Sequence, residues 1–159
     1  NSQFFMKRIF SGLFFISLTA CGDSVSLGGN YYVNRSDSDR IYILKETPSG
    51  PKAIVGEHVV NWKRLKNYTV ILRKVAYSPD CYDKYGVPTI VTHYSEKSEF
   101  WIINVRGEIE YGPFDIAQYK IKLTQLNIPF VTLKEPSDYK ANTAYFNEFT
   151  KRCKIREIK

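Results

Sequence analysis

Short runs of β-branched and aromatic residues, separated by turn residues at intervals of about ten, constrain the fold of this chain most strongly. Pro48, Gly50 and Pro51 mark one such turn, and Lys66-Asn67 mark a hairpin. The runs cover residues 31–34, 39–47, 53–55, 59–65, 68–75, 89–94, 99–105, 108–111 and 130–133. Strands that follow one another through short turns predict a mainly antiparallel sheet. The run over 99–105 lacks strict alternation, which predicts a central strand covered on both faces.

One helix is predicted over about residues 115–126. Asp115 is suited to cap its first turn, and Gln118 follows at the spacing of a capping box. Pro129 prevents the helix from continuing. A second, C-terminal helix is predicted over 144–153. The expected fold class is therefore α+β, with both helices packed on one face of the sheet. The first helix has an apolar face made by Ile116, Tyr119, Leu123 and Leu126.

The first twenty residues have the organisation of an export signal. Residues 1–5 lie upstream of Met6, the expected start, and are set aside. Lys7 and Arg8 precede an apolar stretch over 9–18, which is too short to span a bilayer, since a spanning helix needs about 20 residues. Its length is typical of a signal peptide, so residues 1–20 are expected to be removed.

The end of that segment, Leu18-Thr19-Ala20-Cys21, resembles the lipobox of bacterial lipoproteins. The resemblance implies transfer of a diacylglyceryl group to the Cys21 thiol, cleavage before Cys21, and acylation of the new amino group with a fatty acid such as palmitate. Two or three acyl chains hold a protein firmly on a membrane. The family's sorting rule, applied to Gly22, implies the outer membrane, facing the periplasm, if the cell has two membranes.

Downstream of Cys21, residues 21–29 are rich in Gly and Ser and predict a flexible tether. Residues 30–159 are expected to form a single globular α+β domain. Cys81 and Cys153 are the two cysteines left after lipidation. An oxidising compartment favours a disulfide between them, and the alternative is two separate buried thiols.

Composition limits the partners of the exported part. Only Lys7 and Arg8 are charged among the first 20 residues, so 21 of 23 basic residues remain against 16 acidic ones, a net charge of +5. This modest balance suits anionic lipid or an acidic protein, and export argues against nucleic acid.

No cofactor or metal is expected. His58 and His93 are the only histidines, and their positions do not form a zinc-binding pattern. Glu108 and Glu110 share a strand face, as paired catalytic carboxylates on a glycan-cleaving enzyme would, although a solvated face is the more ordinary meaning.

Trp62, Arg64 and Lys66 are predicted to form a partner-binding face, because alternation sets Trp62 and Arg64 on one side of a strand. The first functional hypothesis is thus a membrane-anchored, non-enzymatic binding module. The alternatives are an immunity or inhibitor lipoprotein that neutralises a toxin such as a secreted phospholipase effector, and an enzyme acting on envelope glycan or lipid. The run 101–104, followed by Tyr111-Gly112-Pro113 and the capped helix, resembles small single-domain lipoproteins of unknown function.

Overall fold

The computed structural model describes residues 23–36, 40–80, 93–137, 139 and 154–158. These residues form strands β1 (Asp23–Gly28), β2 (Tyr31–Arg35), β3 (Ile41–Lys45), β4 (Lys52–Val55), β5 (Val59–Arg64), β6 (Tyr68–Asp80), β7 (His93–Asn104), β8 (Ile109–Phe114) and β9 (Lys154–Ile158), with helix α1 (Ile116–Gln125) between β8 and β9. The expected α+β class, dominated by antiparallel strands, is confirmed.

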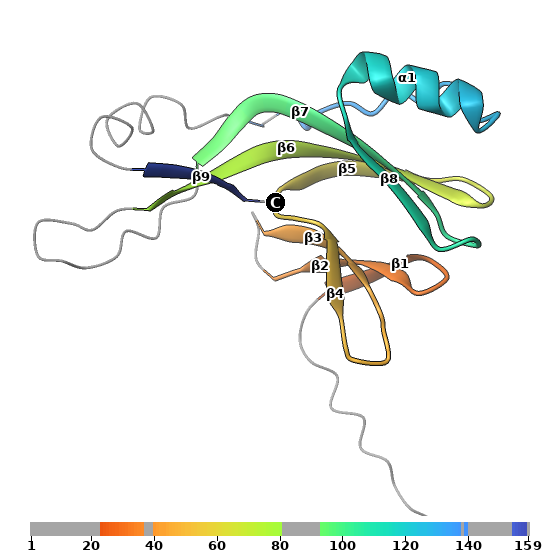
Figure 1. Cartoon of the computed structure of the whole chain (residues 1–159), viewed down its shortest axis with the longest axis horizontal. Helices are drawn as coiled ribbons and strands as arrows, with labels where there is room; N and C mark the ends of the chain where they lie inside the picture. Colours follow the sequence, from red (N-terminus) through yellow and green to blue (C-terminus); the bar gives the residue numbers. More distant parts are fainter. Residues whose placement is uncertain (1–22, 37–39, 81–92, 138, 140–153, 159) are drawn as a thin grey trace, which may run out of the picture.

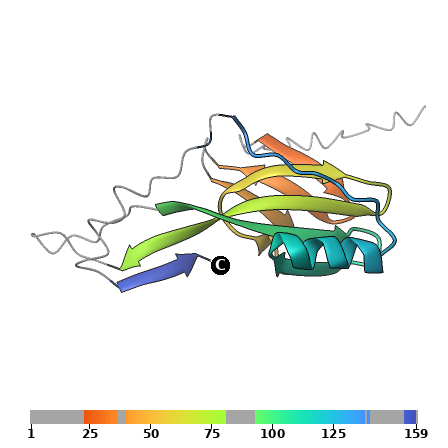
Figure 2. The same ribbon diagram turned by 90° about the horizontal axis from the view of Figure 1, so that it is seen from above.

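The strands form two sheets. The small sheet has the order β1-β2-β3-β4, and the large sheet has the order β5-β6-β7-β8, with β9 paired to the outer part of β6. All pairs are antiparallel. Figure 1 shows the small sheet and α1 on opposite sides of the large sheet. Seen from above, α1 and the segment after it lie over the large sheet, with β1–β4 behind (Figure 2).

Each gap between layers holds its own hydrophobic core. The first core lies between the two sheets and contains Leu27, Tyr31, Val33, Ile43, Val55, Val59, Ile71 and Ile103. The second core lies between the large sheet and α1 and contains Val70, Leu72, Phe100, Ile102, Tyr119, Leu123, Ile128 and Val131. The fold is therefore three layers deep, and the large sheet is the middle layer.

Strands β6 and β7 explain why the most hydrophobic run lacks alternation. Ile71 packs in the first core, whereas its neighbours Val70 and Leu72 pack in the second. Ile102 and Ile103 are adjacent and both 0% exposed. Since successive side chains of a strand point to opposite faces, a strand in the middle layer needs apolar residues at every position. The prediction of a central strand covered on both faces is confirmed.

Helix α1 begins as the sequence predicts. The Asp115 side chain accepts from the Gln118 backbone N–H at 2.8 Å, and the Gln118 side chain accepts from the Asp115 N–H at 3.1 Å. Tyr119 and Leu123 are buried, as expected, and Leu126 packs against the second core. Ile116 is the exception, because it is 47% exposed and does not belong to the inner face.

The flexible tether predicted over 21–29 is wrong from Asp23 onward. Residues 23–28 form β1, which pairs with β2 through Val25 opposite Val33, and Leu27 is buried in the first core. Gly28 and Gly29 both have positive φ and form the turn into β2. Glycines that suggested flexibility therefore serve a tight hairpin, a role that their freedom at positive φ explains.

Two C-terminal elements also differ from expectation. Residues 130–133 do not form a strand, although Val131 is buried and its carbonyl accepts from Tyr119 Oη at 3.2 Å. The predicted second helix over 144–153 lies outside the described residues, as do Cys81 and Cys153. Strand β9, which follows that region, was not predicted.

Gly112 of β8 lies against the Trp101 side chain of β7. Gly112 has φ +138°, and a Cβ there would lie 2.8 Å from Trp101 Cδ2. We expect Gly112→Ala to lower the free energy of unfolding through backbone strain and through a clash with the indole ring.

Gly50→Ala is the matched control. Gly50 has φ +107°, but a Cβ there would meet nothing within 4 Å. Gly50→Ala should lower the free energy of unfolding only by the backbone strain, about 1–3 kcal/mol. Gly112→Ala should lower it by roughly 1–3 kcal/mol more, because its Cβ also overpacks against Trp101. Urea unfolding at unchanged m-value measures both. Equal losses in the two variants would show that the Trp101 contact is unimportant.

Candidate functional site

The predicted partner-binding face is not a free surface. Alternation does set Trp62 and Arg64 on one face of β5, but that face is turned toward the small sheet. Trp62 is half-buried and packs against the first core. Arg64 Nη1 donates to the Ser26 carbonyl of β1 at 3.3 Å. Arg64 and Lys66 are both exposed. Trp62 is thus partly occupied in joining the sheets, and a partner-binding role for Trp62, Arg64 and Lys66 stays a prediction.

Glu108 and Glu110 hold the two sheets together at another edge. Lys45 Nζ of β3 lies 3.0 Å from Glu108 Oε2 and 3.5 Å from Glu110 Oε1. Tyr31 Oη of β2 donates to Glu110 Oε1 at 2.5 Å, and Asn30 Nδ2 donates to Glu108 Oε1 at 2.7 Å. We call these five residues the edge clasp, since it connects the β2–β3 hairpin to β8.

The edge clasp keeps the Tyr31 phenol neutral and the Lys45 ammonium charged. Burial, helped by the hydrogen bond to Glu110, raises the pKa of Tyr31 to about 12. The hydrogen bond to Glu108 is the largest cause that raises the pKa of Lys45 above its ordinary value. A neutral phenol can donate to one carboxylate while the ammonium satisfies both. Both carboxylates are thus engaged in holding the sheets together.

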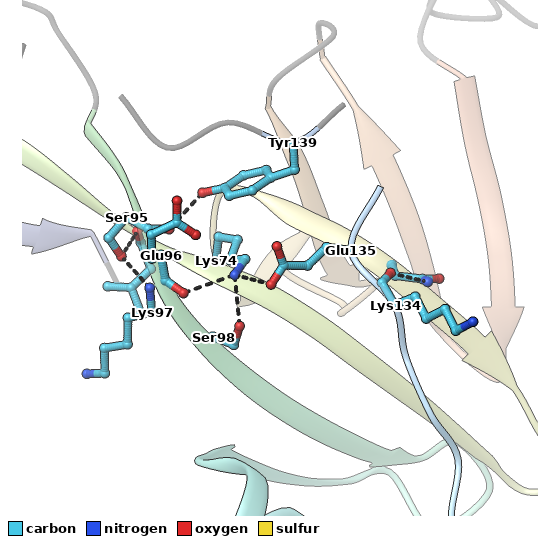
Figure 3. A network of polar contacts seen from close by, with 10 residues as sticks. Lys74, Ser95, Glu96, Lys97, Ser98, Lys134, Glu135 and Tyr139 are labelled. Carbon is cyan, nitrogen blue, oxygen red and sulfur yellow. Dashed lines mark hydrogen bonds and ion pairs between the residues drawn. The ribbon is translucent and has the colours of Figure 1, made fainter. Parts of the chain in front are cut away.

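A second polar cluster surrounds Lys74, whose side chain is only 2% exposed (Figure 3). Its Nζ donates to the Glu96 carbonyl at 3.0 Å and to Ser98 Oγ at 3.0 Å, and it forms an ion pair with Glu135. The Tyr139 ring lies 5.1 Å from the same Nζ. An ammonium has three N–H donors, and three oxygen acceptors surround this one.

Arg73 precedes Lys74 in β6, and its side chain lies on the other face of the large sheet. Its Nη1 lies 2.8 Å from Glu99 Oε2, and its Nε donates to the Glu57 carbonyl at 2.9 Å. The two paired side chains are 3% and 8% exposed. Strand β6 therefore buries two consecutive cations, one on each face of the large sheet. A buried charge is tolerated only when it is paired and hydrogen-bonded, as both are here.

The Lys74 cluster fastens the segment after α1 across the large sheet. Glu135 comes from that segment, and Tyr139 Oη donates to the Ser95 carbonyl of β7 at 2.7 Å. One feature of the sequence does indicate a buried polar cluster here. Arg73 and Lys74 stand inside the apolar strand VILRKVA. Charges in a buried strand require partners elsewhere.

The exposed side of α1 is the remaining distinctive feature. Ile116, Ile121 and Phe130 are 47%, 59% and 56% exposed, which is high for large apolar side chains. Lys120 Nζ lies 5.4 Å from the centre of the Phe130 ring. We call these four residues the outer α1 surface. Unlike the two polar clusters, it leaves apolar side chains open to solvent, and it is our candidate binding site.

These features define a class of small α+β domain, in which two antiparallel sheets and a helical layer are joined by ion pairs and hydrogen bonds. Within the described part of the chain, no helix has both the length and the hydrophobicity needed to cross a bilayer. The model of the DUF3997 family, described as a protein of unknown function, matches residues 28–137, and the chain belongs to this family. No curated protein and no solved structure matches the chain.

The family match spans most of the structural features described above. It begins at Gly28, where β1 ends, and reaches Ser137. Both hydrophobic cores, the edge clasp and the outer α1 surface fall almost entirely within it. Cys21 and β9 lie outside it.

The edge clasp predicts a stability difference that depends on pH. Tyr31→Phe removes the hydrogen bond to Glu110, so we expect a loss of about 1 kcal/mol at pH 8. The folded-state pKa of Tyr31, about 12, exceeds its ordinary value of 10.0. The stabilisation of the folded state by the neutral Tyr31 phenol is therefore complete below pH 10 and is lost as pH rises toward 12. The stability difference between wild type and Tyr31→Phe should shrink over that window.

Tyr32→Phe is the matched control, because Tyr32 is the next residue of β2 and makes only a long, exposed hydrogen bond of 3.4 Å to Glu46. It should change stability by about 0.5 kcal/mol or less. Urea unfolding at pH 8 and pH 11 compares the three proteins. A Tyr31→Phe difference that stays constant or grows between these pH values would contradict the role given to the phenol.

Proposed function

We propose that this chain is a membrane-anchored lipoprotein of the bacterial envelope whose domain acts as a non-enzymatic binding module. The observation that carries the anchoring is the distance between the lipobox and the fold. Strand β1 begins at Asp23, two residues after Cys21. Cleavage before Cys21 would remove residues 1–20, all of which precede the described fold, and would leave the lipidated cysteine next to the first strand.

This spacing gives the anchor a mechanical consequence. Two residues span at most about 7 Å when extended, so lipid on Cys21 would hold β1 and the small sheet close to the membrane surface. A flexible tether would instead allow the domain to rotate freely. We propose that the domain is presented in a restricted orientation. By the sorting rule applied to Gly22, that membrane would be the outer one, on its periplasmic side, in a cell with two membranes.

The proposed binding role is supported by how the polar groups are used. The edge clasp and the Lys74 cluster are each occupied in joining layers of the fold. The outer α1 surface has no such structural duty, and it combines apolar side chains with a lysine. Exposed apolar side chains that gather on one surface are typical of sites that bind another molecule.

A disulfide between Cys81 and Cys153 belongs to the same proposal. In the described ladder between β6 and β9, the last pair is Asp80 opposite Lys154. Cys81 follows Asp80 in the sequence and Cys153 precedes Lys154, and both cysteines lie outside the described residues. Such a bond would form in an exported protein.

The anchoring is tested by replacing each cysteine in turn in the producing bacterium. Cys21→Ser should abolish incorporation of radiolabelled palmitate, because a hydroxyl cannot form the thioether, and the protein should accumulate as an uncleaved precursor or in soluble fractions. Cys81→Ser and Cys153→Ser are the matched controls and should retain the label and the membrane location.

Palmitate that still enters Cys21→Ser would refute the lipobox. The same membrane preparation also reports on the disulfide. Wild-type protein digested without reductant should release a linked peptide pair containing Cys81 and Cys153. Recovery of the two peptides separately, each with a free thiol, would refute the bond without affecting the lipid result.

A further inference from the structure

The outer α1 surface is continuous around the helix. At about 100° per residue, positions 116, 120, 124, 117 and 121 follow one another around the exposed side of α1. Each of these residues is exposed. Phe130 joins them from the segment after the helix, with its ring near Lys120 and edge-on to Tyr119, at a centroid distance of 6.5 Å. The surface therefore has Lys120 at its centre with Ile116, Ile121 and Phe130 around it.

The charge of this surface has one sign. From Ile116 to Lys134 the chain contains Lys120, Lys122 and Lys134 and no aspartate or glutamate. The nearest carboxylates in the sequence are engaged elsewhere, since Asp115 caps α1 and Glu135 pairs with Lys74. A partner that covers the surface would need a carboxylate facing Lys120 and apolar side chains around that carboxylate.

The layer order decides between a protein and a bilayer as that partner. The small sheet contains β1, which adjoins Cys21, and α1 lies on the opposite side of the large sheet (Figure 1). Stacked layers are about 10 Å apart. If lipid holds β1 at the membrane, the outer α1 surface faces away from it. A basic, apolar helix in contact with the bilayer would need the opposite orientation.

We infer that the outer α1 surface docks an acidic protein surface that sets a carboxylate against Lys120 and apolar side chains around it, presented from the side away from the membrane. This inference rests on the proposed lipid anchor, which sets the orientation. Lys120 steers the partner and fixes its position, and Ile116, Ile121 and Phe130 supply the apolar contact.

The test is photocrosslinking in the producing bacterium, with full-length protein that carries a photoreactive amino acid at position 121 or at position 25. Val25 in β1 is 48% exposed and is the matched control on the small sheet. Position 121 should give an adduct with another protein, whose crosslinked peptide is rich in Asp and Glu. Position 25 should give adducts with lipid.

Charge reversal completes the design. Lys120→Glu should lower the yield of the protein adduct about ten-fold, the change expected for about 1.4 kcal/mol of binding energy. Lys52→Glu, an exposed lysine of β4, should leave the yield unchanged. Both residues are exposed, so neither change should alter the unfolding midpoint.

Several results at position 121 would overturn the inference: adducts with lipid, adducts only with another copy of this chain, no adduct, or an adduct insensitive to Lys120→Glu. Failure of the proposed lipid anchor can be distinguished from failure of this inference, because loss of the anchor would remove the lipid adducts at position 25 and the palmitate label.

Discussion

The burial of β6 and β7 on both faces is the constraint on which the rest of the structure depends. In β6, Ile71 belongs to the first core and Val70 and Leu72 belong to the second, so the small sheet and α1 pack on opposite faces of the same two strands. The ion pairs follow the same alternation. Arg73 pairs with Glu99 on the side of the small sheet, and Lys74 meets Glu135 from the segment after α1. Removing one partner of a fully buried pair costs about 3–5 kcal/mol, and this applies to Arg73 and Glu99, whose side chains are 3% and 8% exposed.

Local patterns in the sequence were enough for most elements of this fold. The unbroken apolar run identified β7, and Asp115 with Gln118 identified the start of α1, because burial and capping act on neighbouring residues. The same local logic misread β1, since Gly28 and Gly29 occur in flexible linkers and in tight hairpins alike. Only the pairing of β1 with β2 distinguishes the two cases, and pairing is not a local property.

The candidate site was harder to predict for a related reason. Alternation on β5 correctly grouped Trp62 with Arg64, but it does not say which face of a strand another layer will cover. The small sheet covers that face. The outer α1 surface was missed because Ile116 fits the apolar spacing of α1, and its exposure depends on where the helix sits on the large sheet. The partner of Lys74 comes from a distant segment, which spacing cannot reveal.

The two polar clusters and the short connection to Cys21 together suggest how the domain is presented. The edge clasp connects the small sheet to the large sheet, and the Lys74 cluster connects the large sheet to the segment after α1. A rigid body attached through its first strand has a defined near side and far side. In this account, the near side is the small sheet and the far side is the outer α1 surface.

Fluorescence quenching in the native membrane tests that orientation most directly. A fluorescent amino acid would be placed at position 121 or position 25 of the full-length protein, and lipids with spin-labelled headgroups would be added to membranes that contain it. The account predicts strong quenching at position 25 and little at position 121, because α1 lies beyond the large sheet from β1. Quenching at position 121 as strong as at position 25 would contradict it.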